Sequence, residues 1–186
     1  MKVLLGVLLA WVLAISSWAQ GQSSRLPQFD DYGITEIFTG TPVAPVIETS
    51  LQRMYRTRIR EGVTKGSGVL RDGKEQPGPN FAGHYFVIQW GCGSSCLMMA
   101  VVDASTGRIY YLPMAIGKKG NQRIGLPMFG LRPAEVDFRV TSRLFTMNAC
   151  PEQLNKPHAS CYSYYYLWQD NDWKLLRRVR LEDNPF

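Results

Sequence analysis

Six side chains in this sequence are of the types that carry nucleophilic, redox or metal chemistry: four cysteines and two histidines. They are Cys92, Cys96, Cys150, Cys161, His84 and His158. A cysteine nucleophile needs a base within hydrogen-bond reach. His84 and Cys92 are the candidates for such a pair, which would make the protein a thiol-dependent hydrolase or transferase. An extended strand would hold the two more than about 20 Å apart unless the chain folds back.

The spacing of these residues fits redox and metal sites less well. Three residues separate Cys92 from Cys96, whereas catalytic dithiols usually enclose two residues at the start of a helix. The cysteine and histidine spacing matches no familiar structural zinc site. We therefore expect no metal and no cofactor, and we assign no catalytic residue.

The N-terminus predicts export. Lys2 precedes an apolar run over residues 3–15, and the small residues Ser17 and Ala19 fit a signal peptidase site. Residues 1–19 are thus predicted to be a signal peptide, and Gln20 begins the mature chain. The run is shorter than the roughly 20 residues that span a bilayer. We expect a periplasmic or secreted protein without a stable membrane anchor after cleavage.

Export into an oxidising compartment favours disulfide bonds between the cysteines. An even number of cysteines outside the cytoplasm indicates disulfides, here two. Three connectivities are open. We favour the local pairs Cys92–Cys96 and Cys150–Cys161, because turn-forming residues flank each pair.

The net positive charge of the chain favours anionic partners. The full chain carries a formal net charge of +6, and loss of Lys2 lowers it to +5. A mild basic excess on an exported protein fits contact with anionic polymers or headgroups of the cell envelope. We expect no nucleic-acid partner in that compartment, and the sequence leaves the oligomeric state open.

The elements that must position these residues form one α+β domain over residues 46–186, preceded by an extended N-terminal arm over residues 20–45. Apolar residues at spacings of three and four predict a helix from Val46 to Glu61. Alternating apolar residues and turn signals predict about seven strands in one antiparallel β-meander, stapled by the disulfides. These strands cover residues 85–90, 97–103, 108–112, 138–141, 143–148, 162–168 and 173–181.

One motif gives a resemblance. The run Asn80-Phe-Ala-Gly-His-Tyr85, followed by Trp90-Gly-Cys-Gly-x-x-Cys96 and the turn Asp103–Gly107, resembles a group of small uncharacterised exported bacterial proteins. The resemblance covers residues 50–112. It implies a bacterial, periplasmic origin and brings no activity with it.

A second resemblance concerns a loop. Periplasmic inhibitors of vertebrate-type lysozyme plug the enzyme's cleft with a Cys-Lys-Pro-His-Asp-Cys loop. Here Lys156-Pro157-His158 lies between Cys150 and Cys161, so Lys156 and His158 are candidate binding residues by resemblance. The loop is longer and lacks the aspartate, and the basic charge argues against a basic lysozyme as partner.

Aromatic residues on the second-to-last strand are further candidates for binding. Tyr164, Tyr166 and Trp168 alternate along the sequence and therefore share one face of a strand. Such a row can stack on sugar rings, although cross-strand packing is the commoner role.

Together these patterns predict an exported, non-catalytic binding protein of the bacterial cell envelope. Its partner would be an envelope polymer or an envelope protein. The open alternatives are the thiol-dependent enzyme, an inhibitor of an envelope-directed glycosidase, and a purely structural envelope component.

Overall fold

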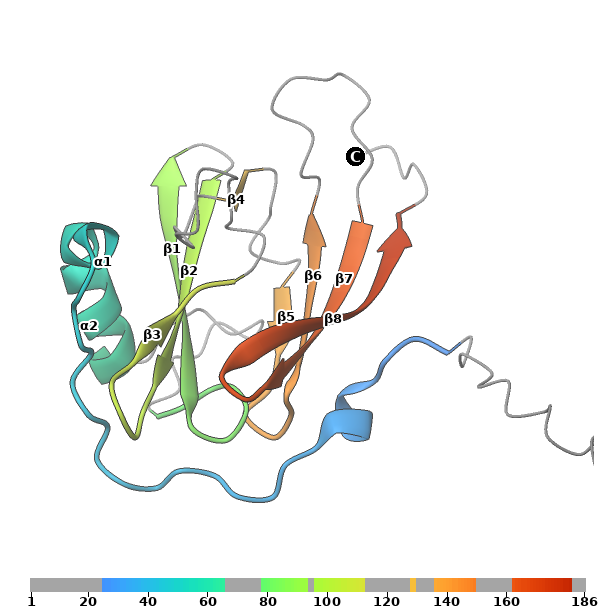
Figure 1. The fold of residues 1–186 in the computed structure, drawn as a ribbon, viewed down its shortest axis with the longest axis horizontal. Helices are drawn as coiled ribbons and strands as arrows, with labels where there is room; N and C mark the ends of the chain where they lie inside the picture. Colours follow the sequence, from blue (N-terminus) through green and yellow to red (C-terminus); the bar gives the residue numbers. More distant parts are fainter. Residues whose placement is uncertain are drawn as a thin grey trace, which may run out of the picture.

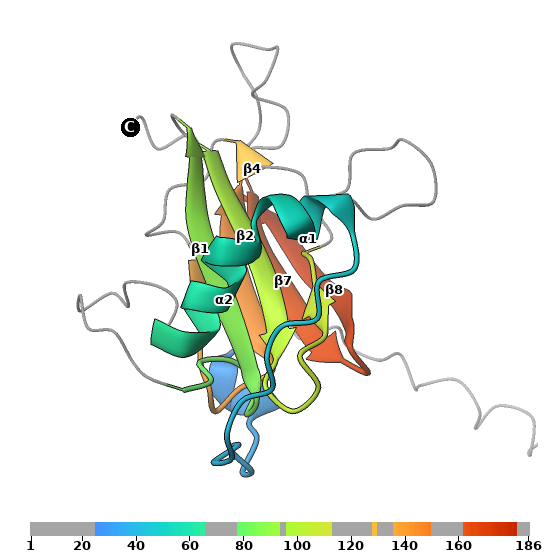
Figure 2. The same ribbon diagram turned by 90° about the vertical axis from the view of Figure 1, so that its left-hand side faces the viewer.

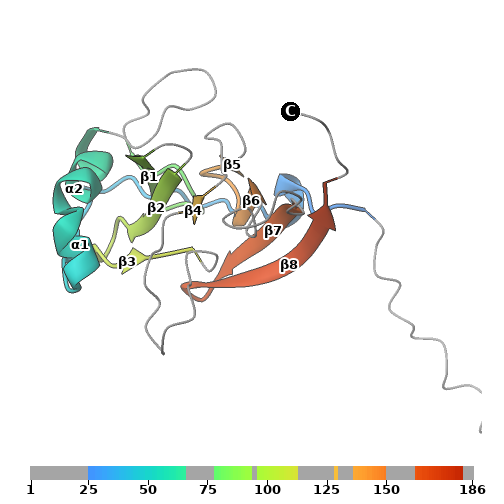
Figure 3. The same cartoon turned by 90° about the horizontal axis from the view of Figure 1, so that it is seen from above.

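The computed structural model describes residues 25–65, 78–93, 96–112, 128–129, 136–149 and 162–181. Within them, two antiparallel sheets pack face to face and two short helices cover the outer face of the first sheet (Figures 1 and 2). The first sheet has the order β1-β2-β3, with β4 also on β2, and the second has the order β5-β6-β7-β8. Viewed from above, the helices, the first sheet and the second sheet form successive layers (Figure 3).

The elements have the following bounds. The first sheet contains β1 (Tyr85–Gly93), β2 (Cys96–Asp103), β3 (Ile109–Tyr110) and β4 (Met128–Phe129). The second sheet contains β5 (Val136–Phe138), β6 (Leu144–Ala149), β7 (Tyr162–Gln169) and β8 (Asp172–Arg180). The helices are η1 (Phe29–Tyr32, a 3₁₀ turn), α1 (Ser50–Met54) and α2 (Arg56–Lys65). In this part of the chain, no helix is long and apolar enough to cross a bilayer.

Strand β1 is buried on both faces. Tyr85 and Val87 point into the core between the two sheets, whereas Phe86 and Ile88 point into the core under the helices. This follows from the two-residue period of a strand combined with apolar residues at consecutive positions. Strand β2 alternates in the same way, so the first sheet needs cover on both sides.

The α+β class is confirmed, but the single meander of seven strands is wrong. The described residues contain eight strands, divided between two sheets. The physical reason lies in the doubly apolar β1 and β2: a single sheet with one helix layer would leave one of their faces in water. The second sheet covers that face.

The predicted helix over 46–61 is two helices that begin four residues later. The Thr49 hydroxyl accepts a hydrogen bond from the Gln52 N–H, and the Gln52 side chain accepts one from the Thr49 N–H. This capping box fixes the helix start at Ser50. The residues before it stay extended, because the Val46 N–H donates to the Gly107 carbonyl at 2.9 Å. Tyr55 ends α1 and separates it from α2.

Helix α2 packs on β1 through a glycine. A Cβ atom added at Gly62 would lie 2.5 Å from Cγ2 of Ile88, which is almost fully buried. We expect Gly62→Ala to destabilise the protein by about 1 kcal/mol, because overpacking costs more than the helix propensity gained. Urea unfolding measures this change. In an Ile88→Ala background the same substitution should stabilise, and destabilisation in both backgrounds would contradict the contact.

The N-terminal arm belongs to the folded domain. It crosses the lower edge of the molecule in Figure 1, from the second sheet to the helices. Backbone hydrogen bonds hold it at intervals: the N–H groups of Ile34, Phe38 and Val43 donate to the carbonyls of Thr141, Gly83 and Ala104. In the described part of the arm, the 3₁₀ turn η1 interrupts the extended chain, and the segment after η1 ties the two sheets together at one end.

Candidate functional site

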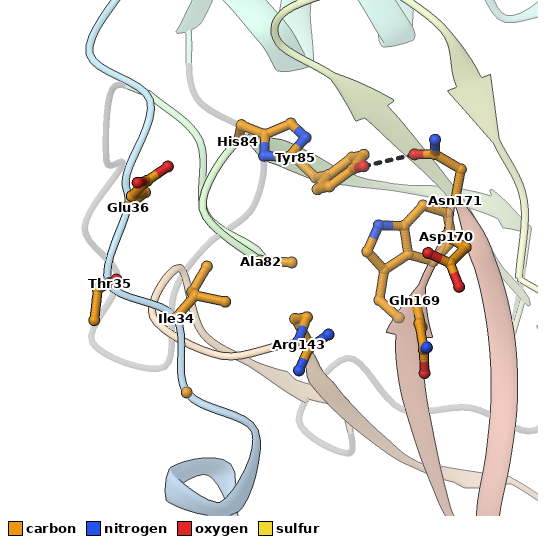
Figure 4. Close-up of a pocket in the computed structure, with 12 residues that line it drawn as sticks. Ile34, Thr35, Glu36, Ala82, His84, Tyr85, Arg143, Gln169, Asp170 and Asn171 are labelled. Carbon is orange, nitrogen blue, oxygen red and sulfur yellow. Dashed lines mark hydrogen bonds between the residues drawn. The ribbon is translucent and has the colours of Figure 1, made fainter.

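A cavity of about 600 Å³ opens at the end of the molecule that the arm crosses (Figure 4). Four segments that are distant in sequence form its walls. They are residues 33–36 of the arm, residues 82–85 before and at the start of β1, Arg143 before β6, and residues 168–171 at the turn from β7 to β8. The volume lies in the range of small-molecule sites.

The turn from β7 to β8 forms one wall and is locked to the first sheet. Asp170 and Asn171 have φ angles of 53° and 59°, as a two-residue type I′ hairpin requires. The Tyr85 hydroxyl donates to Oδ1 of Asn171 at 2.6 Å. Burial raises the pKa of Tyr85 above its ordinary value, which keeps the hydroxyl protonated as the donor.

The opposite wall contains a strained segment. Ala82 and Gly83 have φ angles of 43° and 82°, and the Gly83 N–H donates to the Val140 carbonyl at 2.7 Å. A left-handed conformation costs alanine about 1 kcal/mol relative to the usual helical region. Ala82, Asp170 and Asn171 are the described residues other than glycine with positive φ, and all three line this cavity. Strained backbone of this kind concentrates at functional sites.

Arg143 brings a positive charge to the cavity, and no described carboxylate forms an ion pair with it. Its backbone is fixed, because its N–H donates to the Tyr32 carbonyl at 3.0 Å and its carbonyl accepts from the Trp168 N–H at 2.9 Å. Its half-exposed side chain has a buried Nε that finds no hydrogen-bond partner in the part of the chain that the structure describes. The ion pairs found among the described residues, Arg25–Asp31 and Glu61–Lys65, lie elsewhere.

Two carboxylates face the same cavity. Glu36 lies on the arm and Asp170 lies on the turn from β7 to β8, on opposing sides of the view in Figure 4. Both residues are exposed, and neither forms an ion pair within the described part of the chain. The cavity therefore presents one cation and two anions that are not paired with each other.

His84 lies on the cavity wall between these charges. Its ring centroid is 4.1 Å from that of Tyr85, and its carbonyl accepts from the Ala104 N–H at 2.8 Å. Asp103 lies nearby and is buried. Burial acts to raise the pKa of the Asp103 carboxyl, but hydrogen bonds from Ser105 and Thr106, with a smaller contribution from His84, outweigh it and hold the pKa below its ordinary value. Asp103 thus adds a stable negative charge behind His84.

Comparison with protein-family models, curated proteins and solved structures finds no match. The function of this chain is therefore inferred from the geometry of its own cavity.

The candidate pair His84 and Cys92 lies along one extended strand. His84 directly precedes β1 and Cys92 lies near the end of the same strand, so roughly 25 Å of extended chain separates them. Figure 1 shows β1 running from the arm end to the opposite end of the molecule. A thiol-dependent mechanism needs its base within hydrogen-bond reach of the cysteine, and this separation along the strand does not provide that.

The aromatic row of β7 shares one face, as predicted, but that face is inside the protein. Tyr164, Tyr166 and Trp168 are only 5 %, 5 % and 3 % exposed, and they pack in the core between the sheets. Tyr164 stacks on Tyr166 with an interplanar angle of 7°. A sugar cannot stack on these faces, which corrects their assignment as a binding surface; Trp168 alone reaches the cavity.

Tyr166 provides a pH-dependent test of this burial. Burial raises the pKa of Tyr166 from 10.0 to about 12. Tyr164 adds a smaller upward effect, which outweighs the downward effect of Arg178. Between these values the unfolded chain loses a proton that the folded chain keeps, so stability falls as pH rises, by up to about 1.4 kcal/mol per pH unit. We expect Tyr166→Phe to flatten this fall in urea unfolding from pH 10 to 12. Tyr165→Phe, on the other face of β7, is the control; equal slopes for both variants would contradict the burial.

Several predicted residues lie outside the described part of the chain. They are the signal peptide, Lys156, His158, Cys150 and Cys161, together with the side chains of Cys92 and Cys96. Their roles stay predictions. Among the described residues, no group of three His, Cys, Asp or Glu side chains is placed to hold a metal ion.

Sequence reasoning identified His84 in this site but missed three of its charges. Glu36, Arg143 and Asp170 carry no motif, and they meet only because the arm, the start of β6 and the turn after β7 lie at one end of the fold. The turn itself had a clear signal in Gln169-Asp-Asn-Asp172. Nothing in that signal indicated that it would face a cavity.

Proposed function

We propose that the protein is an exported, non-catalytic binding protein of the bacterial cell envelope, and that its ligand occupies the cavity beside His84. The observation that supports this most directly is Arg143 on the wall of a cavity of about 600 Å³: its buried Nε has no hydrogen-bond acceptor among the described residues, which also give it no ion pair. An unpaired cation in such a place is costly. An anionic group of a ligand offsets that cost.

The rigidity of the walls supports binding. A hydrogen bond joins the Tyr85 hydroxyl to the Asn171 side chain across the junction of the two sheets. Backbone hydrogen bonds at Ile34 and Phe38 hold the arm on either side of Glu36. A site whose walls are already ordered loses little conformational entropy when it binds a ligand.

Two disulfides belong to the same proposal. The backbones of Gly93 and Cys96 are paired across the hairpin from β1 to β2, and Ala149 is paired with Tyr162 where β6 meets β7. These pairings favour Cys92–Cys96 and Cys150–Cys161, because each bond would join residues at or next to a strand pair. Closing short loops in this way stabilises a domain by about 2–3 kcal/mol per bond.

The experiment uses protein purified from the periplasm without reductant. Thiol counting in denaturant should give no free cysteine, and mass spectrometry should place the N-terminus at Gln20. Calorimetry then measures binding of enzymatically solubilised peptidoglycan fragments. We expect binding by the wild type that falls about 10-fold or more in Arg143→Gln. It should be unchanged in Arg58→Gln, which removes an exposed arginine on α2.

Two results would defeat the proposal. Four reactive thiols in the native protein would contradict the oxidised, exported state. Fragment binding that is absent, or equal in wild type and Arg143→Gln, would remove the cavity as the binding site.

A further inference from the structure

We infer that the ligand of the cavity is a zwitterion: its carboxylate pairs with Arg143, and its ammonium group faces Glu36 and Asp170. This inference rests on the proposed binding function and names the ligand class. A free amino acid or the end of a short peptide has this chemistry.

The first step concerns the charge of the cavity. Arg143, Glu36 and Asp170 give the lining of the cavity one positive and two negative charges. A ligand that fills the cavity displaces the water that solvates these charges, so each sign needs a partner on the ligand. A neutral sugar compensates none of the three, and a purely anionic ligand meets two carboxylates. A zwitterion compensates both signs.

The second step concerns Arg143. Hydrogen bonds at its N–H and carbonyl fix its backbone against the 3₁₀ turn and β7, so the guanidinium is positioned by two elements. Its Nε is shielded from water without a protein acceptor. A carboxylate reaching the exposed Nη atoms forms charge-assisted hydrogen bonds, which are the strong kind.

The third step concerns the two carboxylates. Glu36 and Asp170 come from opposing walls and are not neutralised by any ion pair in the described residues. Asp103, next to His84, adds to the negative potential of the cavity, because its low pKa keeps the carboxyl ionised. An ammonium group is the complementary ligand group.

The cavity also has an apolar part that suits the body of such a ligand. Ile34, Ala82 and Trp168 line it together with the charged residues. A small side chain, such as that of alanine, finds an apolar surface there while the charged ends are bound. The volume of about 600 Å³ is sufficient for a dipeptide-sized molecule.

The test is calorimetry with alanyl-alanine of both chiralities and with three matched probes. The probes are its C-terminal amide, its N-acetyl derivative and the neutral disaccharide N,N′-diacetylchitobiose. We expect the dipeptide of at least one chirality to bind, and the amide and the N-acetyl derivative to bind about 10- to 100-fold more weakly. Arg143→Gln should remove the difference between acid and amide. Glu36→Gln/Asp170→Asn should remove the difference between free and acetylated amine, whereas Arg58→Gln should preserve both.

The outcomes separate the two proposals. Equal binding of all dipeptide derivatives, or binding of the disaccharide alone, would overturn the zwitterion while the binding cavity stands. Failure of both dipeptides to bind while peptidoglycan fragments bind through Arg143 would overturn it as well. The urea midpoint of each variant is compared with that of the wild type to show that both are folded. If the folded wild type binds no probe and no peptidoglycan fragment, the proposed function itself fails.

Discussion

Phe81→Ala is expected to lower the free energy of unfolding by about 4 kcal/mol, the largest effect of any substitution considered. Phe81 is fully buried between the two sheets. Its ring stacks on Trp173 at 5.7 Å between centroids and meets Phe145 edge-on at 6.0 Å. Truncation therefore leaves a cavity surrounded by rigid rings, which cannot collapse to fill it.

Urea unfolding at 25 °C measures this loss, and Phe81→Leu is the matched control. Leucine keeps most of the buried volume and should cost about 1.5 kcal/mol. If alanine costs no more than leucine at this position, the aromatic cluster does not hold the sheets together as the structure indicates. Because Phe81 precedes Ala82, the alanine variant should also weaken ligand binding in the cavity.

Gly83→Ala is expected to cost about 3 kcal/mol, for two separate reasons. Gly83 has a φ of +82°, which alanine adopts at a cost of about 1 kcal/mol. A Cβ atom would also lie 2.6 Å from the carbonyl oxygen of Glu36, a backbone atom that cannot rotate away. The arm must shift to relieve the contact, and this shift breaks the hydrogen bond from the Phe38 N–H to the Gly83 carbonyl.

Gly78→Ala separates the two causes. Gly78 also has a positive φ, of +103°, but no atom of the described residues lies within 4 Å of the Cβ position there. It should therefore cost about 1 kcal/mol, the conformational part alone. Limited trypsin digestion after Arg25 should be faster in Gly83→Ala than in Gly78→Ala, because the arm is released. Equal stability and equal digestion of the two variants would show that the arm does not press on Gly83.

Most of the longer elements of this fold could be predicted from local patterns, whereas η1 and β4 were not predicted and β5 shares only residue 138 with the predicted strand 138–141. Apolar runs in residues 85–90 and 97–103 indicated β1 and β2, and Gln169-Asp-Asn-Asp172 indicated the turn from β7 to β8. The start of α1 was misplaced, because the apolar stripe begins before the capping box at Thr49. Periodicity reports which face is apolar, whereas a cap decides where the helix begins.

The face that a strand presents was predictable, but what covers it was not. Tyr164 and Tyr166 share a face in any register, since the side-chain period of a strand is two. Whether that face meets water, a sugar or a second sheet depends on which apolar surfaces remain uncovered elsewhere. Val87 and Val101 on the first sheet required that cover, and the second sheet supplies it.

The sequence by itself determined the local structure of this protein: its strands, the hairpin turn, the extended arm, and a motif that places His84 directly before β1. Only the tertiary structure decided that His84 lies beside Glu36, Arg143 and Asp170. The reason is physical. Hydrogen bonding and side-chain alternation act between near neighbours, whereas a cavity forms where segments far apart in the chain stop packing, and no local pattern encodes that place.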